Sequence, residues 1–198
     1  MAAPTKLNRA LAALLVGAAL ALPAGQAFAG DVQEERTEIR EQSDRALANL
    51  YKMDPGARKA VESAAGYATF SNKGIKIGVA GGGTGRGLAV EAGTGKATYM
   101  RFVEVQAGVG MGIKKYDLIF VFKTRKALDA FIHDGWQYSG QSTVALKHGD
   151  EGTALAGAVS ISPDVWLYQV TSSGLSADLT VKGSKYFPDK ELNQADAK

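Results

Sequence analysis

The sequence contains no cysteine and only two histidines, and these absences limit its chemistry. Without cysteine there can be no disulfide, no thiolate metal ligand and no acceptor for a lipoprotein anchor. His133 and His148 do not occur in an H-E-x-x-H motif or in another spacing typical of zinc ligands. We therefore expect no metal site, and a fold that depends on its hydrophobic core alone.

Motifs for nucleotide binding and for nucleophilic catalysis are missing as well. Lys96 follows a glycine but precedes Ala97, where a phosphate-binding P-loop requires serine or threonine. Gly81 and Gly83 are followed by Arg86, where a dinucleotide-binding turn requires a third glycine. The chain has no G-x-S-x-G nucleophile elbow and no basic run interleaved with aromatics. The sequence thus indicates a non-catalytic protein without cofactors, which binds neither nucleotide nor nucleic acid.

The N-terminal segment differs from the rest of the chain. Two basic residues precede the apolar run Ala10–Leu22, and Ala27 and Ala29 place small residues at positions −3 and −1 of a cleavage site. The apolar run is too short for a membrane-spanning helix, which needs roughly 20 residues. We predict a cleaved signal peptide over residues 1–29 and a mature protein that is periplasmic or secreted.

Glycine is the residue present in excess, with 24 in 198 positions. In an extended chain, residues two apart share a face, so glycine at alternate positions describes a strand with one bare face. Glycine weakens a strand, and its presence there indicates that another part of the protein packs closely against that face. We predict a structural role for two such runs, which comprise Gly81, Gly83, Gly85 and Gly87, and Gly108, Gly110 and Gly112.

The first part of the mature chain is helical in pattern. Apolar residues recur at helical spacing over residues 30–53 and predict an amphipathic helix that lies on the body of the protein. Asp54 and Pro55 are typical of a cap and first turn, so we predict a second helix there that stops at Gly66. The apolar stripe of the first helix consists of Val32, Ile39, Ala46, Leu47 and Leu50.

From Tyr67 onward the apolar period changes to two, which indicates strands. Gly93 to Lys96 predicts a hairpin loop, Thr124 predicts the cap of a short helix, and the tail after Tyr186 is polar enough to predict fraying. The fold class is therefore α+β and mainly antiparallel β, barrel-like or a sandwich, with two N-terminal helices and one short helix between strands. We predict strands near residues 75–80, 87–92, 97–105, 108–113, 118–123, 136–145, 154–161, 165–171 and 175–181, in one β-rich domain over residues 54–193.

Basic residues gather in and around the glycine-rich zone, and two interpretations of them remain open. They can be solubility charges on outward strand faces, or they can neutralise the headgroup of an anionic lipid. The candidates for headgroup contact are Lys73, Lys76, Arg86, Lys114 and Lys115.

Several segments follow one another in a distinctive order and spacing. The first is Gly66-Tyr67-Ala68-Thr69-Phe70 with the glycine-rich run to Leu88, which is similar to the opening signature of the SYLF domain family. The segment from Asp117 to Phe122, followed by Ala127 to Phe131, resembles its central strand and short helix, and Ser173-Gly174-Leu175 resembles its closing strand. The order and spacing of these motifs, over roughly residues 54–193, carry the resemblance.

The resemblance implies a non-catalytic domain that binds membrane lipid; eukaryotic members bind phosphoinositides and bundle actin. The chain departs from the family at Ser176, where a bulky aromatic is usual, and over Asp31–Lys52, which has six acidic against four basic residues. We therefore expect a lipid or an anionic membrane surface as the partner. The alternative is an envelope scaffold that binds a protein partner through its sheet edge or its N-terminal helix.

Overall fold

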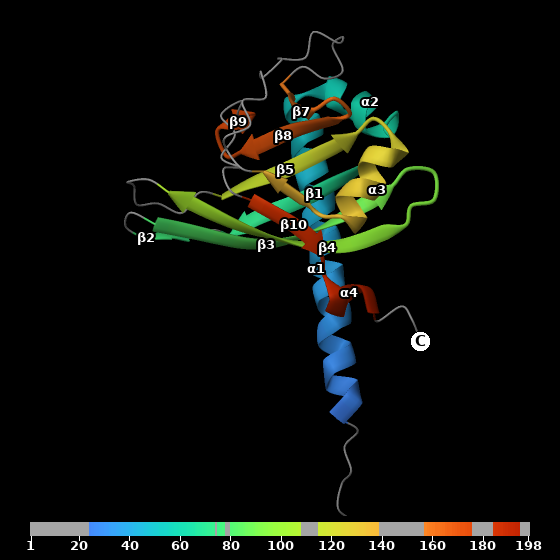
Figure 1. Ribbon diagram of the computed structural model, residues 1–198, viewed down its shortest axis with the longest axis vertical. Coiled ribbons are helices and arrows are strands. Elements are labelled where there is room, and N and C mark those ends of the chain that lie inside the picture. Colours follow the sequence, from blue (N-terminus) through green and yellow to red (C-terminus); the bar gives the residue numbers. More distant parts are fainter. Residues whose placement is uncertain are drawn as a thin grey trace, which may run out of the picture.

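The computed structural model describes residues 24–73, 75–77, 80–107, 115–138, 157–175 and 184–194, and all structural statements below concern these residues. They form one curled antiparallel sheet with helices on both faces, so the predicted α+β, mainly antiparallel fold class is confirmed (Figure 1). The strand order along the sheet is β6-β10-β4-β3-β1-β5-β8-β7, with β2 paired to β3 and β9 paired to β8.

The strands are short at the edges of the sheet and long in its middle. The central strands are β1 (Gly66–Lys73), β3 (Ala80–Glu91), β4 (Ala97–Ala107), β5 (Lys115–Phe122) and β8 (Val165–Thr171). The others are β2 (Ile75–Ile77), β6 (Trp136–Tyr138), β7 (Val159–Ser162), β9 (Gly174–Leu175) and β10 (Ser184–Pro188). The helices are α1 (Ala24–Met53), α2 (Pro55–Glu62), α3 (Arg125–His133) and α4 (Lys190–Gln194).

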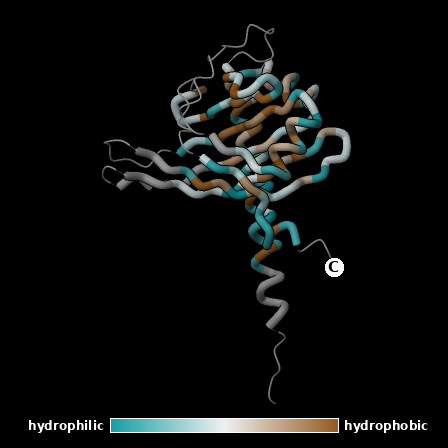
Figure 2. The backbone as a smooth tube through the Cα atoms, viewed as in Figure 1, coloured by the Kyte–Doolittle hydropathy of each residue, from teal (hydrophilic) through white to brown (hydrophobic). Residues whose placement is uncertain are grey.

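Helix α1 packs on one face of the sheet together with α2. Its predicted apolar stripe is buried, and Leu47 and Leu50 pack with Ile119 and Tyr168 of the sheet. The predicted start of α2 is also confirmed, because Asp54 accepts a hydrogen bond from the backbone N–H of Gly56 at 2.9 Å. In Figure 2 the hydrophobic positions gather in the sheet between the helices. No helix among the described residues has both the length and the hydrophobicity needed to span a bilayer.

Helix α3 covers the opposite face of the sheet, over an aromatic cluster. Thr124 caps this helix as predicted, accepting from the N–H of Ala127, and its apolar residues enter the core. Phe70 stands edge-on to four other rings, among them Phe102 and Tyr186 at centroid distances of 5.8 Å and 4.8 Å. Such edge-to-face pairs stabilise a core beyond the area they bury.

The bare face of β3 lies against this cluster. A Cβ atom at Gly85 would overlap the ring of Phe102, and one at Gly87 would lie 2.6 Å from Phe70 Cδ1. The main chain of the neighbouring strand is equally close, since the same Cβ at Gly85 would be 2.7 Å from the carbonyl oxygen of Ser71. Gly108, Gly110 and Gly112 lie outside the described residues.

Two of the sequence predictions are wrong. Gly66 does not end α2, which stops at Glu62 with Ser63 as its cap; Gly66 instead begins β1, the strand at the centre of the sheet. A Cβ at Gly66 would lie 2.7 Å from Leu128 Cδ2, so this glycine serves close strand–helix packing.

From Tyr186 to Gln194, where the described part of the chain ends, the chain does not fray as predicted. It continues as β10 to Pro188 and then forms α4, whose Leu192 is buried. Asn193 pairs with the main chain of β4: its amide donates to the carbonyl oxygen of Tyr99 at 2.8 Å and accepts from the Tyr99 N–H at 2.9 Å. Part of the polar composition of this segment, at Asp189 and Asn193, therefore serves specific hydrogen bonds.

Substitution of Gly87 tests the bare face. Gly87→Ala should lower the free energy of unfolding by about 2–3 kcal/mol, because its methyl group overlaps the Thr69 carbonyl oxygen and the Phe70 ring. Gly95→Ala is the matched control: nothing lies within 4 Å of its Cβ, and its φ of +68° costs about 1 kcal/mol for alanine. Urea denaturation compares the two variants, and an equal or smaller loss for Gly87→Ala would contradict this account of the strand.

Candidate functional site

Two lysines lie opposite each other at the end of the sheet where β1 stops and β5 starts. Lys73 and Lys115 are Cα partners in the antiparallel ladder. They follow in register the pair Ser71 and Asp117, whose side chains are hydrogen-bonded at 2.7 Å on the face that carries α1. Since alternate residues of a strand share a face, Lys115 belongs to the α1 face like Asp117, and Lys73 is its Cα partner.

The exposed positions of the neighbouring strands continue this row. Val103 on β4 is the Cα partner of both Thr84 on β3 and Lys185 on β10. All three are exposed, and Val103, at 39 %, is one of only two large hydrophobic residues exposed among those described. We call this set the sheet-end surface: Lys73, Lys115, Thr84, Val103 and Lys185.

Beyond this row, β2 and the adjoining ends of β3 and β4 project past the body of the protein (Figure 1). By register, Ile75 is the Cα partner of Gly82, which in turn is the partner of Val105. Val105 is two residues from Val103 and therefore belongs to the same face. The projecting end thus continues the sheet-end surface with apolar positions. Lys76 lies on β2, opposite Gly81.

The structure brings together only some of the predicted headgroup residues. Lys73 and Lys115 are opposite each other, and Lys76 lies on the strand that continues the same end of the sheet. Arg86 is elsewhere, beneath α1, and Lys114 lies outside the described residues. Sequence reasoning missed Lys185, because the polar tail gave no sign of a strand that pairs with β4.

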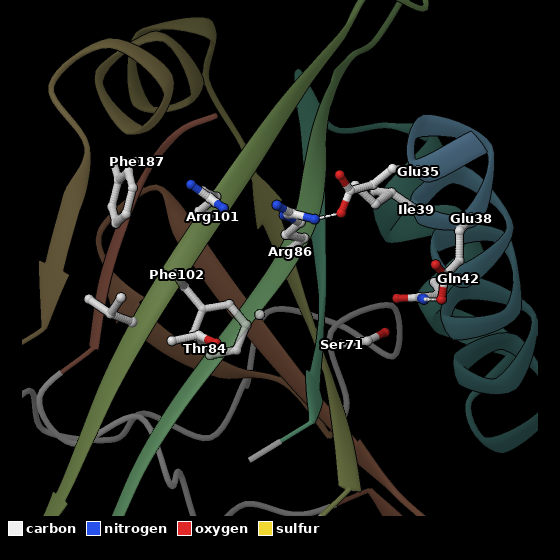
Figure 3. Close-up of a pocket in the computed structure, with 12 residues that line it drawn as sticks. Glu35, Glu38, Ile39, Gln42, Ser71, Thr84, Arg86, Arg101, Phe102 and Phe187 are labelled. Carbon is white, nitrogen blue, oxygen red and sulfur yellow. Dashed lines mark hydrogen bonds and ion pairs between the residues drawn. The ribbon is translucent and has the colours of Figure 1, made fainter. Parts of the chain in front are cut away.

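Arg86 lies in a groove of about 590 Å³ between α1 and the strands β3 and β4 (Figure 3). Its guanidinium forms ion pairs with Glu35 of α1 and, at 3.5 Å from its Nε, with Asp189. Arg101, the Cα partner of Arg86, lies with its Nε 3.1 Å from the same Asp189 oxygen.

Asp189 links the two arginines of this groove to helix α4. It is 1 % exposed, and its second oxygen accepts from the backbone N–H groups of Glu191 and Leu192 at 3.1 and 3.2 Å. The carboxylate thus caps the first turn of α4 and also neutralises the two arginines. These contacts offset the cost of burying its charge.

Asp117 has the most clearly perturbed carboxyl group in this region. Burial raises its pKa above the ordinary value, while the hydrogen bond from Ser71 and the positive charge of Arg45 act in the opposite direction. Desolvation is the largest of these effects, and it disfavours the charged form.

A further group of buried polar side chains, Glu104, Tyr116 and Tyr186, lies in the core on the α3 face. The hydroxyl of Tyr116 donates to Glu104 at 2.5 Å, and complete burial raises the pKa of Tyr186 well above its ordinary range. Within the described ranges, no group of three His, Cys, Asp or Glu residues could hold a metal ion.

Comparison with known proteins adds two findings. Residues 103–195 match the Ysc84 family, described as a Las17-binding protein actin regulator. The chain is also similar to Beta cell expansion factor A of Aeromonas veronii, with 32% identity over 163 residues. That alignment covers 82% of this chain and 60% of the relative, so the chain spans about three fifths of the relative's length.

Replacement of Asp117 should stabilise the protein at neutral pH. In the folded chain the carboxyl keeps its proton to a higher pH than in the unfolded chain, because burial raises its pKa. Its destabilising effect is therefore absent below the ordinary value of 3.8, grows as the pH rises through the raised pKa, and is constant above it.

We expect Asp117→Asn to raise the free energy of unfolding at pH 7 and to match the wild type near pH ~3, where both states are protonated. Asparagine can still accept the hydrogen bond from Ser71. Asp134→Asn is the control for the loss of one carboxylate, because it makes the same chemical change at an exposed position. Urea unfolding across this pH range would contradict the assignment if Asp117→Asn were destabilising at pH 7.

Proposed function

Because the chain belongs to the Ysc84 (SYLF) family over residues 103–195, we propose that it is an exported, non-catalytic protein that binds anionic lipid surfaces through its sheet-end surface. The pairing of Lys73 with Lys115 is the observation that carries this proposal. The family is known for lipid binding and actin regulation, and the geometry favours the first of these for this chain.

The lysine pair is unfavourable for the protein by itself. Like charges directly opposite each other on antiparallel strands lower stability. Among the described residues, Lys115 forms no ion pair with a carboxylate. An anionic surface would neutralise this repulsion, and the removal of the repulsion would contribute favourably to the free energy of binding.

The apolar positions beside the lysines suit a membrane rather than a small anion. Val103 is exposed between Thr84 and Lys185, and Ile75 and Val105 continue its face by register. Each lysine near an anionic membrane contributes about 1 kcal/mol, and adjacent apolar side chains can enter the interface. Both contributions arise at one end of the sheet and can act together.

The proposed absence of catalysis is supported by what the described residues do. The groove arginines are engaged by Glu35 and Asp189, and the carboxylate of Glu104 is buried in the core. Neither arrangement places a nucleophile beside a base at an accessible site.

A protein partner is the second candidate function, favoured by the family description, which names Las17 as a partner of its members. The outer strands β6 and β7 of the described sheet could pair with an added strand. A partner bound in this way would not depend on the sheet-end lysines.

Charge reversal at Lys115 separates lipid binding from stability. Lys115→Glu places an acid opposite Lys73 and should raise the free energy of unfolding by about 0.5 kcal/mol. The same change should weaken co-sedimentation with vesicles rich in anionic phospholipid by roughly 30-fold, since it removes one attraction and adds one repulsion of about 1 kcal/mol each.

Lys126→Glu is the matched control, because it makes the same charge change on α3, on the other face of the sheet. It should leave vesicle binding within about twofold of wild type if the charge acts locally. Equal losses of vesicle binding in both variants would show that binding depends only on the net charge of the protein. Unchanged vesicle binding by Lys115→Glu would refute the proposed surface.

Export predicts a defined N-terminus. Protein recovered from the envelope or the medium should begin at Gly30 by intact mass, with residues 1–29 removed. Cleavage there shortens α1 but leaves Asp31, Glu34 and Glu35 in its first turns, where acidic residues are favourable. Ala29→Leu should block processing, whereas an unprocessed wild-type chain in the cytoplasm would contradict export.

A further inference from the structure

The groove beneath α1 adjoins the sheet-end surface, with which it shares Thr84 and Val103, but its charged residues are different. Its volume of about 590 Å³ is within the range of small-molecule sites. Strands β3 and β4 form its floor, where Arg86 and Arg101 lie side by side, and α1 forms the wall that carries Glu35 and Glu38 (Figure 3). One side is therefore basic and the other acidic.

Arg101 retains donors for a ligand. Its side chain is 42% exposed, and its contact with Asp189 uses only Nε. The two terminal amino groups of its guanidinium carry four further N–H donors, which make no ion pair or hydrogen bond within the described parts of the chain. A planar fork of this kind is suited to a phosphate or carboxylate.

The acidic wall changes which ligand fits. Glu35 already pairs with Arg86, and Glu38 lies beside Gln42, whose amide donates to it at 2.8 Å. A purely anionic headgroup bound to Arg101 would lie opposite these carboxylates and be repelled by them. A headgroup that carries both a phosphate and an ammonium group would match both sides of the groove.

The groove also has an apolar exit. Phe187 is the Cα partner of Arg101 and is half-buried, and exposed Val103 lies two residues along β4. Both line the groove, and Figure 3 shows Phe187 beside Arg101. A chain of methylene groups leaving the phosphate could therefore lie along these side chains towards the end of the sheet.

We propose that the groove binds one molecule of a zwitterionic phospholipid, with its phosphate at Arg101, its ammonium group at Glu38 and its acyl part against Phe187 and Val103. This inference rests on the proposed function in that the ligand is a lipid. It concerns a different contact, since the sheet-end lysines meet a charged surface and the groove takes a single headgroup.

Short-chain phospholipids below their micelle concentration test the groove without a membrane. Titration calorimetry should show that full-length protein binds dihexanoyl phosphatidylethanolamine more tightly than dihexanoyl phosphatidylglycerol. Arg101→Gln should weaken binding of the ethanolamine lipid at least tenfold. Glu38→Gln should abolish the preference between the two lipids, while Glu41→Gln, an exposed change on the same helix, should keep it.

Arg101→Lys guards against loss of the fold, because it keeps a positive charge beside Asp189 but lacks the bidentate fork. It should remain folded by circular dichroism and still bind the ethanolamine lipid more weakly than wild type. Unchanged affinity in both Arg101 variants, equal binding of the two lipids by wild type, or equally tight binding of inorganic phosphate would overturn the proposal.

The proposals for the sheet-end surface and for the groove can be refuted independently of each other. Lys115→Glu should lose anionic vesicles and keep its affinity for the soluble ethanolamine lipid. A wild-type chain that binds anionic vesicles but not the soluble lipid would overturn the groove and leave the sheet-end surface standing. The converse result would refute the sheet-end surface and leave the groove.

Discussion

The close approach of an aromatic cluster to the bare face of β3 is the constraint on which the fold depends. Phe70 and Phe102 occupy the space that side chains at Gly85 and Gly87 would need. The rings fill this space, and α3 packs its own Phe131 against Phe70 and Tyr186. The entropic cost of glycine in a strand is thus offset by aromatic packing.

On the opposite face of the same strands, one polar row interrupts the apolar residues that pack against α1, and it positions the groove. One register row runs from Asp117 through Ser71, Arg86 and Arg101 to Phe187. Helix α1 crosses this row and supplies Glu35, so its contact with the sheet at this point is ionic. Strand alternation therefore places an aromatic core on one face and, along this row, a charged contact on the other.

The fold was predictable where a signal is local, and less so where partners are distant in sequence. The caps at Asp54 and Thr124 and the apolar stripe of α1 follow from short-range patterns, and the structure has them. The predictions for Gly66 and for the segment after Tyr186 were wrong, because the conformation there depends on contacts with Leu128 and with Tyr99, which are far away along the chain. The pairing of Lys73 with Lys115 needed the strand register, which the sequence does not supply.

The α1 face contains the same unfavourable feature twice, with two different outcomes. Arg86 and Arg101 are directly opposed like charges, and so are Lys73 and Lys115. The arginine pair is neutralised from within, by buried Asp189 and by Glu35. No carboxylate among the described residues forms an ion pair with Lys115. Because opposed like charges lower stability, an anion from outside the protein would stabilise the lysine pair most. The arginine pair is already stabilised by carboxylates of the protein itself.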